Sequence, residues 1–258
     1  MITETITPSE QLPSRTAPTP NLGLTRTRPS RILYPGIALM IAVVVGVGFG
    51  PTLGVRLIHP PSPRPGVLYL HVALFVAWVL IFVVQTLLVR SRRIGWHRRL
   101  GIFGAMTGTS MPIIGIATAL TMTRLAGNGV AGQAALVISF FDMFAFASTF
   151  GLAVWLRHRP DYHRRLMLMA SCGLTVAAFA RFPTWLMPDN AWYIAVDALI
   201  LVAVLRDVIV ERRLHPVFKV GLPLLMAGQA TAMWIFLSRS PIWLSIARGL
   251  LRTLSPPT

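Results

Sequence analysis

The sequence predicts an all-α protein, a polytopic transmembrane helix bundle of about seven membrane-spanning helices followed by an interfacial helix at the C-terminus. Three observations favour this fold class. Hydrophobic residues make up 54% of the chain and charged residues only 12%, and the mean hydropathy is +0.65. Soluble domains carry roughly a quarter charged residues, so this chain has too little charge to coat a water-facing surface. The apolar residues also gather into long stretches, and most arginines fall between them.

The segments follow in order along the chain. Residues 1–31 are rich in Thr, Pro and Ser and predict a disordered tail. Seven later stretches are long enough to cross about 30 Å of hydrocarbon, and they must be helical because lipid offers the backbone no hydrogen-bond partners. They lie at 32–54, 67–89, 101–123, 134–156, 166–187, 191–210 and 217–238. The third is the least regular, because it is interrupted by Thr107, Thr109, Ser110 and Pro112.

The chain therefore divides into the tail, a seven-helix transmembrane domain at 32–240, and an interfacial helix and tail at 241–258. Within 241–253, Trp243, Ile246 and Leu250 share one helical face. An amphipathic segment of this kind predicts a helix that lies on the membrane surface.

The basic residues predict the orientation of the bundle. Those of the tail, of 90–99, of 157–165 and of 206–219 all fall on one side of a seven-helix arrangement, and removing any one span would scramble this segregation. The positive-inside rule places that side in the cytoplasm. We therefore expect a multi-pass protein of the bacterial inner membrane, with its N-terminus cytoplasmic and its C-terminus outside. Its expected partners are the bilayer and anionic lipid headgroups, and not nucleic acid, despite the net charge of +16.

Several other classes of protein are disfavoured by what the sequence lacks. The single cysteine, Cys172, allows no disulfide framework or thiolate metal site. A retinal protein needs a lysine in mid-membrane, and the one lysine, Lys219, lies at the edge of the last span. No phosphate loop, H-E-x-x-H or G-x-S-x-G motif is present. No catalytic residue and no metal site is predicted.

Four ionisable residues fall within predicted spans: His71, Asp142, Arg181 and Asp197. Each unpaired Asp or Arg at the bilayer centre costs roughly 2.5–3.5 kcal/mol, so pairing or a wet cavity is expected. Arg181 and Asp197 lie eight residues to either side of Asp189 in a short turn, which predicts equal depth and a direct ion pair. All four are expected in the outer half of the membrane.

Two glutamines extend this candidate site. Gln85 follows His71 and Trp78 at intervals of seven residues, so the three share a face of one helix. Gln229 lies near the middle of the last span. Two interpretations remain open for the whole group: an ion pair that locks helices together around a satisfied His71, or a polar cavity open to the outer side that serves proton transfer or a small ligand.

A second group of histidines lies at the predicted cytoplasmic boundary, namely His97, His163 and His215, each beside arginines. One interpretation is that they anchor helix ends among anionic headgroups. The other is a b-type haem held by two histidines, with arginines meeting its propionates.

A short internal repeat includes two of these histidines. Trp96-His97-Arg98-Arg99-Leu100 is matched 66 residues later by Tyr162-His163-Arg164-Arg165-Leu166. Duplication of a helix pair and convergence on a basic helix start both explain it. Glycine pairs at Gly104 and Gly108, and at Gly46 and Gly50, predict close helix packing.

The runs at 96–101 and 163–168, together with Arg181, Arg213-Leu214-His215-Pro216 and Pro241-Ile242-Trp243-Leu244, resemble a motif of uncharacterised bacterial polytopic inner-membrane proteins. Some of these resemble transmembrane b-type cytochromes and haem A synthases, which implies a possible haem cofactor. The leading expectation is an inner-membrane protein with a buried polar site in the outer half of its bundle. The alternatives are a haem- or quinone-linked redox protein, a small transporter or proton channel, and a structural subunit of a membrane complex.

Overall fold

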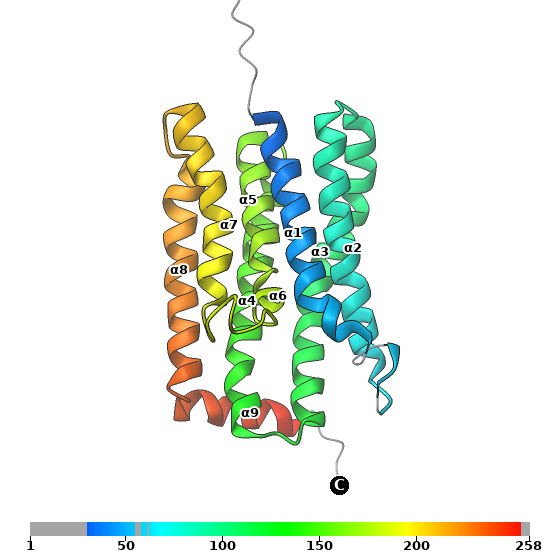
Figure 1. The fold of residues 1–258 in the computed structure, drawn as a ribbon, viewed down its shortest axis with the longest axis vertical. Helices are drawn as coiled ribbons and strands as arrows, with labels where there is room; N and C mark the ends of the chain where they lie inside the picture. The colour runs from blue at the N-terminus through cyan, green and yellow to red at the C-terminus, as the bar shows by residue number, and fades with distance from the viewer. Residues whose placement is uncertain (1–29, 55–57, 61, 254–258) are drawn as a thin grey trace, which may run out of the picture.

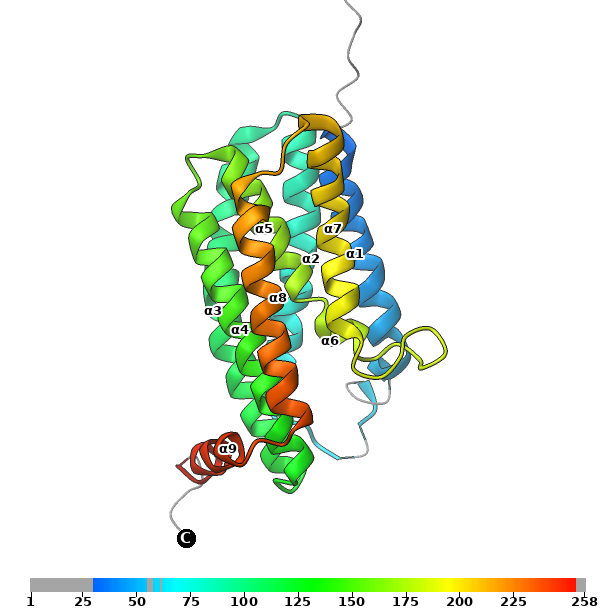
Figure 2. The same cartoon turned by 90° about the vertical axis from the view of Figure 1, so that its left-hand side faces the viewer.

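The computed structural model describes residues 30–54, 58–60 and 62–253, and within these ranges it contains helices and no strands. The predicted all-α class is confirmed. Eight helices run roughly along one axis in Figure 1, and a ninth, α9, lies crosswise at one end, as Figure 2 also shows. Their bounds are α1 Ser30–Leu53, α2 Gly66–Arg90, α3 Ile94–Leu125, α4 Val130–Trp155, α5 Pro160–Gly173, α6 Val176–Phe179, α7 Trp192–Arg206 continued by the π-helical turn η2 Asp207–Glu211, α8 Pro216–Leu237 and α9 Pro241–Thr253.

The two ends of the bundle differ in their connections. The Ser30 end holds the start of α1 and the connections α2–α3, α4–α5 and η2–α8 (Figure 1). The α9 end holds the α3–α4 connection and the α8–α9 corner. The predicted tail and the last residues, 254–258, lie outside the described residues, except that Ser30 and Arg31 already belong to α1.

Five helices, α1, α2, α3, α4 and α8, are long and apolar enough to cross a membrane, so the chain is an integral membrane protein. They overlap five of the predicted spans, although α3 begins at Ile94 and α4 at Val130, ahead of the predicted 101 and 134. The remaining two, 166–187 and 191–210, correspond to α5–α6 and to α7–η2, which are shorter helices in the same bundle. The count of seven spans therefore stays a prediction.

The segment predicted as a continuous span at 166–187 is broken. Helix α5 starts earlier, at Pro160, and ends at Gly173, and α6 ends at Phe179. The following turn, residues 180–191, stops short of the α9 end in both views (Figures 1 and 2). We call this segment the recessed turn.

The third predicted span is the longest helix, although its polar residues suggested irregularity. Helix α3 has 32 residues and contains Pro112 without a break. The Ser110 hydroxyl donates to the Met106 carbonyl at 3.0 Å, and Thr118 donates to Ile114 at 2.7 Å. Because these hydroxyls bond to carbonyls of their own helix, they need no other partner.

The helix predicted at 241–253 is confirmed with the same bounds. Ala247 and Leu251 are buried against Leu136 of α4, and the Trp243 indole donates to the Gln133 carbonyl at 3.0 Å. Ile246 is half exposed.

Glycine packing is confirmed for one predicted pair and wrong for the other. A Cβ added at Gly104 or Gly108 would meet Ile81 or the rings of Phe150 and Trp78. Nothing lies within 4 Å of one added at Gly46 or Gly50. The close contact of α1 is instead made by Gly48, which lies against the backbone of Ala178 in α6.

The internal repeat begins two equivalent helices. Arg93 and Arg159, 66 residues apart, are the N-caps of α3 and α5. Their carbonyls accept hydrogen bonds from the amides of His97 and His163 at 3.1 and 3.0 Å. The two motifs thus share a local geometry at the same end of the bundle.

Candidate functional site

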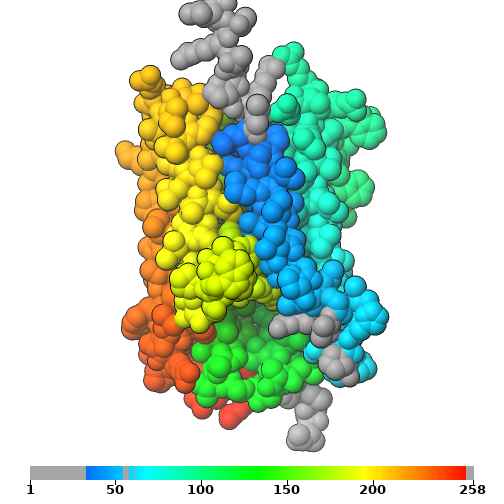
Figure 3. Space-filling view, in the orientation of Figure 1, coloured from blue at the N-terminus to red at the C-terminus, as the bar shows by residue number. Residues whose placement is uncertain are grey.

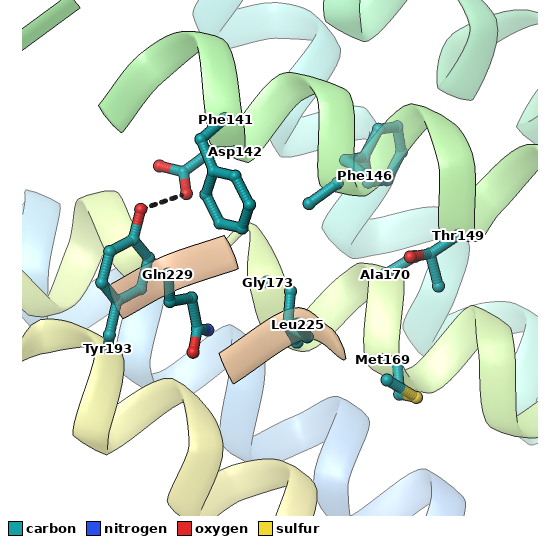
Figure 4. Close-up of a pocket in the computed structure, with 11 residues that line it drawn as sticks. Phe141, Asp142, Phe146, Thr149, Met169, Ala170, Gly173, Tyr193, Leu225 and Gln229 are labelled. Carbon is teal, nitrogen blue, oxygen red and sulfur yellow. Dashed lines mark hydrogen bonds between the residues drawn. The ribbon is translucent and has the colours of Figure 1, made fainter. Parts of the chain in front are cut away.

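A hydrogen bond between side chains of two helices that are distant in sequence lies at the centre of the candidate site. The Tyr193 hydroxyl on α7 donates to Oδ1 of Asp142 on α4 at 2.8 Å (Figure 4). The ring of Phe141 packs edge-on to Tyr193, with ring centroids 6.2 Å apart. Tyr193 was not among the residues singled out by the sequence, because a tyrosine near a helix end is ordinary in membrane proteins.

Two more predicted residues lie beside this bond. Asp197 is one turn beyond Tyr193 on α7, so both side chains lie on the same face. The Gln229 amide of α8 lies next to the Asp197 carboxyl. Oδ1 of Asp197 is buried and has no hydrogen-bond partner among the described residues. Four polar side chains from α4, α7 and α8 thus meet in one place, which we call the carboxyl site: Asp142, Tyr193, Asp197 and Gln229.

A small cavity of about 20 Å³ adjoins the carboxyl site (Figure 4). Its polar lining comes from Asp142, Tyr193, Gln229 and Thr149, and its apolar lining includes Phe141, Phe146 and Leu225. A water molecule needs roughly 10–15 Å³ of such volume and several polar partners. The cavity therefore has room and hydrogen-bonding groups for one water.

His71 and Arg181 form a different group from the carboxyl site. The imidazole of His71 stacks on Phe75, with ring centroids 4.2 Å apart. Arg181 is exposed, lies 4.3 Å over the ring of Phe49 and donates to the Ala177 carbonyl. Its charge is close enough to act on His71.

The expected Arg181–Asp197 ion pair is not among the ion pairs of the described residues, which all involve Asp161, Asp207 or Glu211. The prediction that Arg181 and Asp197 lie at equal depth assumed a continuous helix through Arg181. Because α6 ends at Phe179, Arg181 stands in the recessed turn, where depth no longer grows by 1.5 Å per residue.

Gln85 also lies away from the carboxyl site. Its side-chain amide donates to the carbonyl of His97 at 3.1 Å, where it joins α2 to α3. Gln85 does share a helical face with His71 and Trp78. That face runs the whole length of a 25-residue helix, so Gln85 and His71 lie far apart along it.

The strongest charge cluster lies near the Ser30 end, and the sequence reasoning missed it. Arg165 is fully buried, and its Nε donates to Asp207, also buried, at 2.6 Å. Its other nitrogens donate to Glu211 at 2.8 Å and to the Asp161 carbonyl at 2.9 Å. Arg164 and Arg206 complete the set with contacts to Asp161, Asp207 and Glu211. We call these six residues the arginine network.

The arginine network joins α5 to η2 and balances three arginines against three carboxylates. Burial opposes the charge of Glu211, but the hydrogen bond from Arg206 and the charges of Arg165 and Arg206 outweigh it and lower the pKa of Glu211 below its ordinary 4.5. The stabilisation from Glu211 is therefore fully present above pH 4.5 and is lost as the pH falls through the lowered value. One signal in the sequence could have indicated this network: Asp207 and Glu211 lie at the end of a predicted span, beside the arginines that were assigned to topology.

The haem interpretation of His97, His163 and His215 stays a prediction. His163 Nδ1 lies 2.8 Å from the Ala153 carbonyl, a suitable second contact for an axial ligand. His97 lies close enough to His163 for the charges of the two rings to interact. His215 lines a separate open groove of about 690 Å³.

No family model matches the chain, and neither a curated protein nor a solved structure matches it. The fold and its apolar helices define the class, a helical multi-pass membrane protein.

Proposed function

We propose that this chain is a multi-pass protein of the bacterial inner membrane that takes up protons from the outer side at the carboxyl site. The observation that carries this proposal is the Tyr193–Asp142 hydrogen bond beside Asp197 and a cavity of one-water size. The proposal develops the transporter or proton-channel interpretation of the sequence.

Buried carboxylates are costly unless something stabilises their charge. A carboxylate held away from water is stabilised by a cation, by hydrogen bonds or by a proton. Every ion pair among the described residues lies in the arginine network, at the other end of α5 and α7. The carboxyl site offers Asp142 and Asp197 a hydroxyl, an amide and room for water, and these are the groups of a proton-binding site.

Access for protons is supported by the recessed turn. Asp142 lies twelve residues into α4, about 18 Å from its Val130 end at 1.5 Å per residue. Tyr193 is the second residue of α7, so α7 begins near that depth. Figure 3 shows this face of the molecule hollowed below the recessed turn, in front of α4. Arg181 and Asn190 are exposed there, and polar side chains at this depth call for water.

Proton uptake is tested with purified protein in liposomes that enclose a pH-sensitive dye, under an imposed potassium diffusion potential. We expect the wild-type protein to acidify the lumen faster than empty liposomes. Asp142→Asn should lower the rate roughly a hundredfold, as expected for loss of a proton-transfer group, and Tyr193→Phe should lower it less. Asp189→Asn, which changes an exposed carboxyl, should leave it unchanged.

Two results would contradict the proposal. One is a wild-type rate equal to that of empty liposomes in protein shown to be folded. The other is an undiminished rate in Asp142→Asn, which would place proton movement elsewhere in the bundle.

The orientation of the bundle is part of the same proposal. Cysteines introduced at Ser91, Asp161 and Glu211 should react with a membrane-impermeant maleimide from the cytoplasmic side, and those at Gly127 and Asn190 from outside, with Cys172 replaced by alanine as background. Cys172 is buried, so its replacement removes a site of slow side reaction. Labelling of positions 161 and 190 from the same side would eliminate the seven-span topology.

A further inference from the structure

A wide groove of about 690 Å³ lies at the Ser30 end, between the α4–α5 connection and the η2–α8 connection. One wall is formed by residues 158–162 and the other by residues 213–216. Each wall leads into a helix through an X-Pro step, Arg159-Pro160 and His215-Pro216. Because proline fixes its own φ and restricts the residue before it, both walls have a defined backbone.

The groove is positively charged. Arg159 and Arg213 are exposed on opposite walls, and His158 and His215 lie beside them. One acid, Asp161, also lines the groove, but its carboxylate is held by Arg164 at 2.7 Å. The net charge that the groove offers to a ligand is therefore positive.

His215, which lines the groove, can supply a hydrogen-bond donor. His215 Nδ1 accepts the Val217 amide at 3.3 Å, so a neutral ring carries its proton on Nε2 and can donate it. Burial and the charge of Arg165 lower the pKa of His215, which keeps the ring neutral near pH 7. Helices α5 and α8 both begin at the groove, and the positive ends of their dipoles favour an anion.

We propose that this groove binds the phosphate of an anionic phospholipid headgroup, held between Arg159 and Arg213 and hydrogen-bonded by His215. The position fits a lipid better than a free anion. The groove lies at the end of the bundle where α4 ends and α5 and α8 begin, the end expected to meet the cytoplasmic headgroups, and exposed Leu214 on its wall offers an apolar contact for the glycerol region.

The proposal is tested by native mass spectrometry of the whole protein in detergent, titrated with phosphatidylglycerol or with phosphatidylcholine. Wild-type protein should retain phosphatidylglycerol preferentially. The double variant Arg159→Gln/Arg213→Gln should weaken that retention at least about tenfold, since two charge-assisted hydrogen bonds are lost. The matched control is Arg92→Gln/Arg93→Gln, the same charge change in the α2–α3 connection at the same end.

Each alternative result has a clear meaning. Equal losses in the two double variants would show diffuse attraction to basic residues and overturn the groove site. Unchanged retention in Arg159→Gln/Arg213→Gln would also overturn it. Displacement of the lipid by millimolar inorganic phosphate would identify a free anion as the ligand and contradict the lipid assignment. Unaltered thermal stability of both variants is required for the comparison.

Discussion

Replacing Arg165 with glutamine is expected to destabilise the protein by roughly 3–5 kcal/mol, the usual result of removing one partner from a buried ion pair. Asp207 would lose its 2.6 Å contact while staying buried, and Glu211 would lose one of its three arginines. Thermal unfolding in detergent, followed by circular dichroism, measures the effect. Arg164→Gln is the matched control, because Arg164 is about one-third exposed and its pairs are worth at most about 1 kcal/mol.

A double-mutant cycle separates the pair from its surroundings. Arg165→Gln/Asp207→Asn should recover part of the combined loss, because the two buried charges that contact each other are removed together. Strictly additive losses would contradict a direct Arg165–Asp207 interaction. An effect of Arg164→Gln as large as that of Arg165→Gln would contradict the assignment of the energy to the buried member of the motif.

The second large effect is expected at Gly48. A side chain there would collide with the backbone of Ala178, which cannot move aside as a flexible side chain can. We expect Gly48→Val to cost about 1–3 kcal/mol through overpacking and to lower the unfolding temperature in detergent. Gly46→Val, two residues away on α1 with open space beside it, should change stability by less than about 0.5 kcal/mol. Comparable losses in both variants would mean that valine disturbs α1 itself rather than its contact with α6.

The helices could be predicted from the sequence because long apolar runs in lipid have few alternatives. Helices α2, α8 and α9 match their predicted bounds within one residue. The segment 166–187 could not be predicted in the same way. Hydropathy is blind to where a helix breaks, and α5 stops at Gly173, α6 begins at Val176, and the chain turns after Phe179 although every residue from 166 to 180 is compatible with a span.

The candidate site was predicted in part for the same reason. Asp142, Asp197 and Gln229 were identified because polar residues in apolar runs are few, and they do meet. The Arg181–Asp197 pair was wrong because it depended on helical depth across a segment that is not helical. Arg165 was missed because an arginine in a basic boundary motif was assigned to topology, and its burial depends on α7 and η2, which are more than 25 residues away.

The recessed turn leaves the helices on different sides of the molecule with unequal lengths. Helix α3 rises about 48 Å over its 32 residues, whereas α7 begins near the depth of Asp142, well short of the α9 end. A bilayer meets a short apolar side by thinning and a long one by thickening or by helix tilt, at a cost of fractions of a kcal/mol per Å. Lipids beside the recessed turn are therefore expected to be compressed relative to those around α3, and Trp185 in that turn is exposed, as suits an interfacial tryptophan. The stability of this protein should therefore depend on bilayer thickness. Thinner membranes should relieve the mismatch on the side of the molecule that carries Arg181.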